Sequence, residues 1–112
     1  MISKDRLIQD LRTLGLASDM DVMVHSSLTS IGDVAGGAAT MIDALLEAIG
    51  PGGTLLMPSF NHRAAQVFNP MTTPTTNGTI PDVMWRRSDA VRSLHPTHCV
   101  AAIGPNAAHY CR

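Results

Sequence analysis

The first half of the chain alternates short apolar runs with a helical pattern. Residues 21–25 and 54–57 are short and mostly apolar, a pattern typical of strands that are buried on both faces. Between them, residues 38–49 carry apolar side chains at intervals of three and four, which places those side chains on one helix face. This unit predicts two parallel strands that are joined by a right-handed crossover through the helix.

Helices are also predicted on either side of this unit. Ser3 suits the N-cap of a first helix and Gly15 suits its left-handed end, with an apolar stripe of leucines between them. The run Thr79-Ile80-Pro81-Asp82 resembles a capping box and opens a helix that extends to about Arg87. The intervening residues 61–78 show no clear period and are predicted to form a long loop of the kind that is often functional.

The last part of the chain adds one strand and one helix. Residues 98–103 are predicted to form a third strand, and Gly104-Pro105-Asn106 opens a final helix. Together these elements predict an α/β fold with a short, mainly parallel sheet and flanking helices. The length of 112 residues fits a single domain over residues 1–112.

Composition excludes several classes of protein. The chain is 45% hydrophobic and 15% charged with a net charge of −1, which argues against disorder and against a nucleic-acid partner. No apolar run reaches the roughly 18 residues of a membrane helix, so no membrane partner is expected. The first residues lack an apolar signal core and two cysteines make no disulfide framework, so a cytoplasmic location is expected. The seven methionines are interpreted as core packing.

A first candidate site follows the first predicted strand, where open α/β sheets bind ligands. Hydroxyl side chains and an imidazole come first, and a glycine pair then precedes the central helix, whose free N–H groups favour phosphate or pyrophosphate. The residues of this group are His25, Ser26, Ser27, Ser30, Gly36 and Gly37. Spacing alone favours the simpler interpretation of turn residues, because the pattern is neither a Walker motif nor a dinucleotide fingerprint.

A second candidate group precedes the third predicted strand and contains Arg92, Ser93, His95 and His98. These side chains supply a general base, a phosphate-binding guanidinium and a hydroxyl donor. A zinc site would need His25 or Cys99 as a further ligand, and no carboxylate motif accompanies the histidines. Alternatively, the histidines hydrogen-bond buried backbone groups. Cys99, at the start of an apolar strand, is interpreted as a buried, inert thiol.

Several separated motifs resemble, in the same order, those of the aminoglycoside N3-acetyltransferase family. The first is Val-Met-Val-His-Ser-Ser-Leu-Thr-Ser-Ile-Gly at 22–32, followed by the glycine pair at 36–37. The second is Gly-Pro-Gly-Gly-Thr-Leu-Leu-Met-Pro at 50–58. The third begins Arg-Ser-Leu-His-Pro-Thr-His at residue 92, and Cys99 then stands where the family usually has serine.

The resemblance implies acetyl transfer from acetyl-CoA to the 3-amino group of an aminoglycoside antibiotic or a related amine, with antibiotic resistance as the consequence. No metal is expected, because Pro96 separates His95 from His98 and no carboxylate motif accompanies them. The implied coenzyme-binding residues are His25, Ser26, Ser27, Ser30, Gly36, Gly37, Arg92, Ser93 and His95. The family's expected catalytic histidine lies in a distal Asn-Thr-Ser-x-His motif that this sequence lacks. The catalytic residue is therefore unassigned, with His95 and His98 as candidates.

Family members are more than twice as long as this chain. The resemblance therefore implies that residues 1–112 are a truncated, coenzyme-binding part of a larger α/β acetyltransferase fold, whose activity alone is open. Two other hypotheses compete with it. One is a non-catalytic CoA- or nucleotide-binding remnant, and the other is a metal hydrolase that uses His25, His95 and His98. Self-association through exposed sheet edges is also expected.

Overall fold

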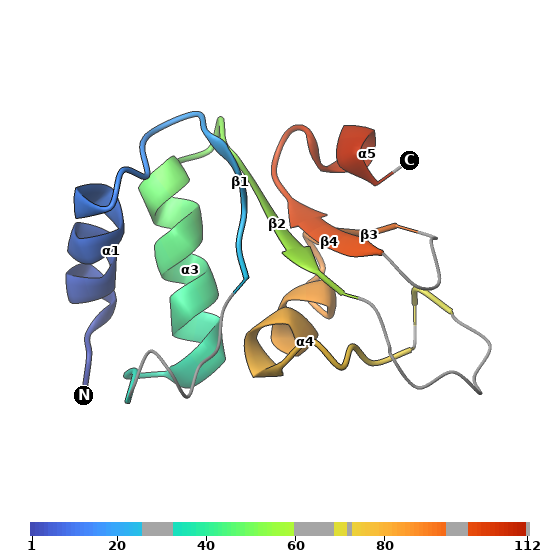
Figure 1. The fold of residues 1–112 in the computed structure, drawn as a ribbon, viewed down its shortest axis with the longest axis horizontal. Coiled ribbons are helices and arrows are strands. Elements are labelled where there is room, and N and C mark those ends of the chain that lie inside the picture. The colour runs from blue at the N-terminus through green and yellow to red at the C-terminus, as the bar shows by residue number, and fades with distance from the viewer. Residues whose placement is uncertain (26–32, 60–68, 72, 94–98, 112) are drawn as a thin grey trace.

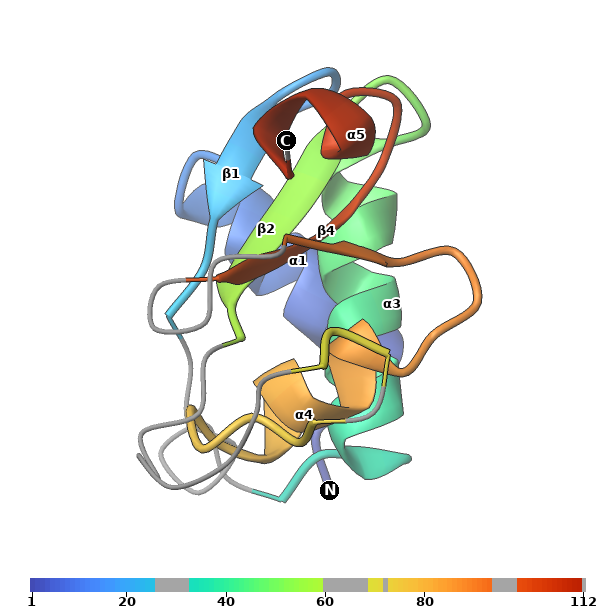
Figure 2. The same ribbon diagram turned by 90° about the vertical axis from the view of Figure 1, so that its right-hand side faces the viewer.

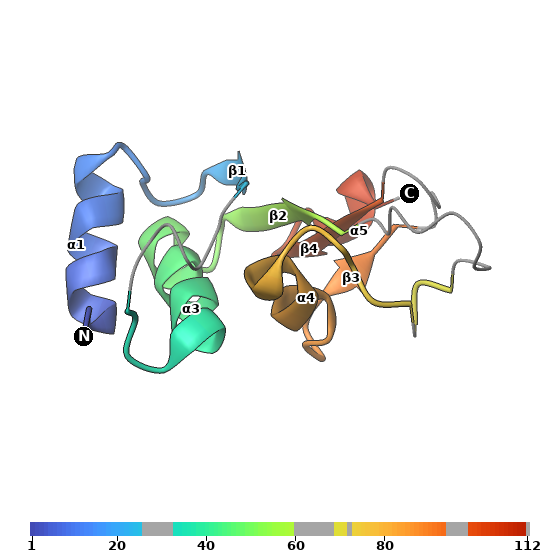
Figure 3. The same cartoon turned by 60° about the horizontal axis from the view of Figure 1, so that its bottom comes forward.

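The protein contains one four-stranded sheet with helices on both faces (Figures 1 and 3). The computed structural model describes residues 1–25, 33–59, 69–71, 73–93 and 99–111. The strands are β1 (Asp21–Met23), β2 (Thr54–Pro58), β3 (Val91–Arg92) and β4 (Val100–Ile103), in the spatial order β1-β2-β4-β3. The α/β class predicted from the sequence is confirmed.

The directions of the strands correct part of the prediction. β1 and β2 are parallel, as predicted, and α3 (Gly37–Ile49) connects them. β4 lies antiparallel to both of its neighbours, β2 and β3. Three of the four strands therefore run in one direction, yet only one of the three pairings is parallel. The prediction of a mainly parallel sheet is wrong in this respect, because the third predicted strand, β4, is inserted in reverse between β2 and the short strand β3, which the sequence analysis missed.

The main core lies between one face of the sheet and three helices, α1 (Lys4–Thr13), α3 and α4 (Thr79–Trp85) (Figure 3). The predicted N-cap is confirmed, since the Ser3 hydroxyl accepts a hydrogen bond from the Arg6 N–H at 3.2 Å. The apolar face of α3 is also confirmed, with Ile42, Leu45 and Ile49 fully or almost fully buried. Removing such side chains from a packed core typically costs about 2–5 kcal/mol.

Burial separates the two predicted parallel strands. All five residues of β2 are buried, as expected for a central strand. β1 lies at the edge of the sheet, where Asp21 and Met23 are exposed and only Val22 packs partly against the main core. The prediction that both strands are buried on both faces is therefore wrong for β1, because the layer on its second face does not extend over it.

The seven methionines also differ in burial. Three of them are buried in the main core: Met41, Met57 and Met84. The other four have exposed side chains: Met1, Met20, Met23 and Met71. The interpretation of all seven as core packing is thus wrong for more than half of them.

The start of α4 also differs from the prediction. The N-cap is Gly78 with no side-chain cap, and Thr79 is already helical. The Asp82 carboxylate does not cap the helix. It accepts hydrogen bonds from the Thr75 N–H at 3.2 Å and from the Trp85 indole N–H at 2.9 Å. The predicted capping box is absent because the loop before the helix uses the carboxylate that would have formed it.

The second face of the sheet carries a smaller cluster beneath α5 (Ala107–Tyr110), the predicted final helix (Figure 2). Leu56 and Ala102 of the sheet pack there against Ala107 and Cys111. The longest helix in the described part of the chain has 13 residues, and no helix there is long and apolar enough to cross a membrane.

Candidate functional site

The described residues of the two candidate groups include some that follow the carboxyl ends of strands, at one end of the sheet. β1, β2 and β3 finish at this end, and β4 begins there, as the strand pairings require (Figure 1). His25 is exposed just after β1, and Ser93 is buried directly after β3. The remaining candidates of these segments lie outside the described residues: Ser26, Ser27, Ser30, His95 and His98. The topology therefore brings the ends of β1 and β3, with His25 and Ser93, to the same end of the sheet.

The N-terminus of α3 presents backbone donors without a side-chain cap. Gly36 is the N-cap with φ +85°, and Gly37 opens the helix with φ +65°. A Cβ at Gly36 would lie 2.0 Å from the Thr40 hydroxyl, so this position requires glycine. A Cβ at Gly37 would meet nothing within 4 Å. The Gly37 N–H donates to the Val34 carbonyl at 3.0 Å. The first turn carries no acidic residue, so the N–H groups that follow Gly37 and the positive end of the helix dipole are available to an anion.

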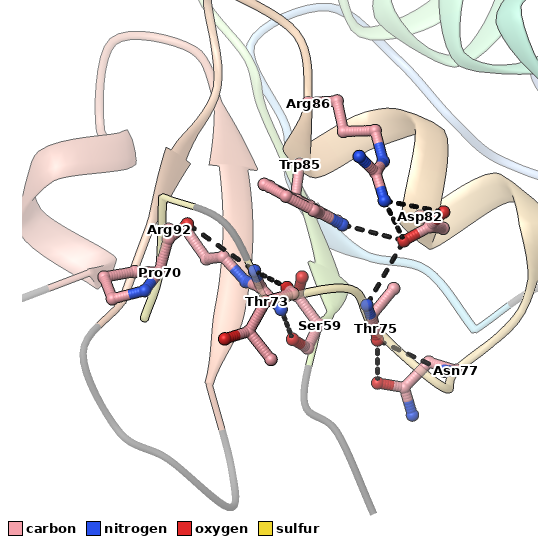
Figure 4. Close-up of polar contacts among 9 residues, drawn as sticks. All are labelled: Ser59, Pro70, Thr73, Thr75, Asn77, Asp82, Trp85, Arg86 and Arg92. Carbon is pink, nitrogen blue, oxygen red and sulfur yellow. Dashed lines mark hydrogen bonds and ion pairs between the residues drawn. The ribbon is translucent and has the colours of Figure 1, made fainter. Parts of the chain in front are cut away.

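The Arg92 guanidinium is engaged by the protein itself (Figure 4). Nη2 donates to the Ser59 carbonyl at 2.5 Å, and Nη1 donates to the Thr73 carbonyl and makes a longer contact of 3.5 Å to the Pro70 carbonyl. Burial lowers the pKa of Arg92 from its usual value, although the group stays cationic at neutral pH. The sequence suggested a guanidinium that binds phosphate, whereas both terminal nitrogens here hold main-chain oxygens.

Ser93 and Cys99 lie beside Arg92, where β3 ends and β4 begins, and both form hydrogen bonds there. The Ser93 N–H donates to the Val100 carbonyl, and the Ser93 hydroxyl accepts from the Val100 N–H, both at 2.9 Å. The Cys99 thiol donates to the Ser59 carbonyl at 2.8 Å. Cys99 is fully buried, and burial raises the pKa of its thiol. This agrees with the interpretation of Cys99 as a buried thiol, since a thiol with a raised pKa is a poor nucleophile.

Sequence reasoning missed the aromatic centre of this region. The Trp85 ring has the guanidinium carbons of both Arg86 and Arg92 at 4.4 Å from its centroid (Figure 4). Its indole N–H donates to Asp82. Burial alone would raise the pKa of Asp82, but hydrogen bonds from Trp85, Thr75 and Arg86 lower it overall. The single tryptophan next to an Arg-Arg pair was the available signal, since guanidinium groups favour aromatic faces.

The metal hypothesis finds no support in the part of the chain that the structure describes. No three His, Cys, Asp or Glu side chains gather there in a group that could hold an ion. His95 and His98, two of the ligands that this hypothesis needs, lie outside those residues.

Comparison with known proteins identifies the family. The family model described as aminoglycoside 3-N-acetyltransferase matches residues 23–112. Aminoglycoside N(3)-acetyltransferase IV from Salmonella sp is 41% identical over 106 residues, which cover 93% of this chain and 40% of that protein.

Solved structures agree in fold. A mutant of aminoglycoside acetyltransferase AAC(3)-IVa in complex with apramycin is 40% identical, with a TM-score of 0.89 over 94% of this chain and 44% of that one. AAC-IIIb in a binary complex with CoASH is 27% identical, with a TM-score of 0.88 over 97% of this chain and 48% of that one. The chain thus spans less than half the length of these relatives. Because the family model matches most of its residues, the chain belongs to the aminoglycoside 3-N-acetyltransferase family.

Proposed function

We propose that this chain forms the coenzyme-binding part of an enzyme that transfers an acetyl group from acetyl-CoA to the 3-amino group of an aminoglycoside. The observation that carries the proposal is the uncapped N-terminus of α3, with two left-handed glycines and open space before Gly37. A phosphate of the coenzyme fits such backbone donors. The CoASH complex of AAC-IIIb supports this choice of ligand.

The proposed binding residues act in two ways. The first turn of α3, which follows the Gly36 N-cap, offers backbone N–H groups, although the Gly37 N–H itself donates to the Val34 carbonyl. His25 is exposed just after β1, where a ligand can reach it. Arg92 and Ser93 hold the main chain at the carboxyl end of β2 and at the start of β4 through the hydrogen bonds described above. The proposal also includes the four coenzyme-binding candidates outside the described residues: Ser26, Ser27, Ser30 and His95.

The reaction sets further requirements. The acceptor amine must lose its proton before it attacks the thioester carbon, the carbon–sulfur bond breaks as the amide forms, and the CoA thiolate takes up a proton. Donors must also face the carbonyl oxygen as negative charge develops on it. His95 and His98 remain the candidate bases in this chain. Apramycin, which AAC(3)-IVa binds, is a suitable first acceptor to test.

The direct test measures transfer. The purified chain is incubated with acetyl-CoA and apramycin, free thiol is followed with a chromogenic disulfide, and the acetylated product is identified by mass spectrometry. We expect thiol release that depends on the acceptor. Binding of CoA without thiol release would instead favour a non-catalytic CoA-binding protein. Absence of both binding and release would contradict the proposed function.

A matched pair of variants tests the site. Gly37 and Gly50 lie at opposite ends of α3, have φ of +65° and +69°, and would each place a Cβ in open space. Gly37→Val imposes backbone strain on the order of 1–2 kcal/mol, and Gly50→Val costs at least as much because ψ of Gly50 is 180°, in a region that only glycine adopts readily. We expect both to lower stability, but only Gly37→Val to weaken CoA binding. Equal CoA affinity in the two variants would show that the coenzyme does not approach the start of α3.

We further propose the cytoplasm as the compartment of the protein. Cys99 and Cys111 are both free thiols in the structure. Unpaired cysteines are typical of proteins in reducing compartments.

A further inference from the structure

We propose that Arg92 is a positioning residue, whose guanidinium fixes the described residues of segment 69–75 (69–71 and 73–75) to the carboxyl end of β2 and thereby shapes the coenzyme site without contacting the coenzyme. The ligand-binding experiment below rests on the proposed function. The hydrogen-exchange experiment tests the role of Arg92 without it.

The first observation is the set of atoms that Arg92 joins. Its Nη2 donates to the carbonyl of Ser59, the residue that follows β2, and its Nη1 donates to the carbonyl of Thr73. The guanidinium is thus a bridge between two stretches of main chain that are fourteen residues apart. A planar fork with two terminal nitrogens satisfies both carbonyls at once, whereas the single ammonium of lysine is a point charge on a shorter reach.

The second observation is that the same segment is anchored from α4. The Thr75 N–H donates to Asp82 at 3.2 Å, and Asp82 also accepts from the Trp85 indole. Trp85 in turn stacks against the Arg92 guanidinium, 4.4 Å from the ring centroid (Figure 4). Segment 69–75 is therefore held by two connected anchors, at Thr73 and at Thr75.

The third observation separates positioning from phosphate binding. Arg92 is half-buried, and both of its terminal nitrogens already donate to main-chain oxygens. A phosphate that recruited this guanidinium would have to share it with carbonyls that already fix its orientation. Ser59 is itself fully buried, so its carbonyl would lose a strong charged donor and keep only the weaker Cys99 thiol. The geometry therefore favours an indirect role.

The binding test compares three ligands that share the pantetheine arm: CoA, dephospho-CoA and pantetheine. We expect Arg92→Gln to weaken all three by a similar factor, about tenfold, because the shape of the site changes. Arg92→Lys should not restore affinity, since one ammonium cannot bridge the two carbonyls. Arg86→Gln is the matched control, because Arg86 stacks on the same ring at the same distance but donates to Asp82 instead. It should keep near-normal affinity.

Other outcomes overturn the proposal. Loss of affinity confined to the phosphate-bearing ligands, with a shallower salt dependence and partial rescue by Arg92→Lys, would identify Arg92 as a phosphate ligand. Unchanged affinity for all three ligands would remove its role in the site.

Hydrogen exchange tests the anchor without any ligand. The Thr73 N–H donates to the Asn69 carbonyl at 2.8 Å, and the Thr75 N–H donates to Asp82, so both amides should be protected. Arg92→Gln should speed exchange at these two amides while amides of α3 keep their protection, which also shows that the variant folds. Unchanged exchange at Thr73 would refute the anchor. If the parent chain binds none of the three ligands, the proposed function fails, but this exchange experiment still decides the structural claim.

Discussion

The carboxylate of Asp21, the first residue of β1, accepts a hydrogen bond of 2.8 Å from the hydroxyl of Tyr110 on α5. The same oxygen accepts from the Asn106 side-chain amide at 3.0 Å, and the other oxygen accepts from the Thr54 N–H at 3.1 Å. One exposed carboxylate thus joins the first strand, the second strand and the last helix. This contact holds α5 over the second face of the sheet.

Stability should depend on pH through Asp21. Hydrogen bonds from Asn106 and Tyr110 lower its pKa from the ordinary value of 3.8. Because the folded-state pKa is depressed, its stabilising contribution is complete above the unfolded-state pKa and is lost as pH falls through the folded-state pKa. Urea unfolding between pH 6 and pH 2 should therefore show a smaller acid dependence in Asp21→Asn than in the parent. An identical acid dependence would mean that these hydrogen bonds do not form in solution.

Gly104 should tolerate no side chain. Its φ is +137°, and a Cβ would lie 2.4 Å from the Gly53 carbonyl oxygen and 2.7 Å from the Thr54 Cα. We expect Gly104→Ala to lower the free energy of unfolding by about 2–4 kcal/mol, from backbone strain and overpacking together. Gly15→Ala is the control, since φ is +115° and nothing lies within 4 Å. It should cost about 1 kcal/mol in urea titrations. Equal costs would show that the close approach is absent.

Both thiols should be slow to react in the folded state. Cys99 and Cys111 are buried, and burial raises the pKa of each. The thiolate is the reactive form, so little of it is present at neutral pH. Titration with a chromogenic disulfide should give delayed colour in buffer and two rapid equivalents in denaturant. Rapid labelling in buffer, under conditions in which the protein is fully folded, would contradict the burial of these side chains.

The edge of β1 should support self-association, which the sequence also predicts. The Met20 carbonyl accepts from the Thr54 N–H, and the Val24 N–H donates to the Leu56 carbonyl. Because alternate residues of a strand face opposite sides, the main-chain groups of Met23 face away from β2, and its side chain is 47% exposed. An open edge with an apolar side chain invites pairing with another chain. Light scattering should show mass rising with concentration, and Met23→Lys should reduce the rise because lysine blunts strand edges. A monomer at all concentrations would refute this prediction.

The fold was largely predictable from local patterns. The spacing of apolar residues in α3 and the short apolar runs in β1 and β2 predict a crossover unit, because each pattern indicates which side chains are buried together. The position of β4 between β2 and β3 was not predictable, since the direction of a strand depends on pairing between distant residues. β3 has only two residues, too few to show a period.

The candidate site was predictable in part. The glycine pair at 36–37 has positive φ angles, +85° and +65°, which glycine adopts without steric cost. The role of Arg92 was hidden, because the carbonyls that it joins are main-chain groups that every residue carries. The contribution of Trp85 was hidden for a similar reason, since its partners come together only when α4 packs beside β3 and β4.

Thermal unfolding by circular dichroism, with and without CoA, tests most directly whether this chain carries a formed coenzyme site. A ligand that binds only the native state stabilises it, by about 2.7 kcal/mol at a hundredfold excess over Kd. We predict one cooperative transition that moves upward as CoA is raised to millimolar concentration, and a smaller movement in Gly37→Val than in Gly50→Val. A transition that CoA does not move would contradict the account.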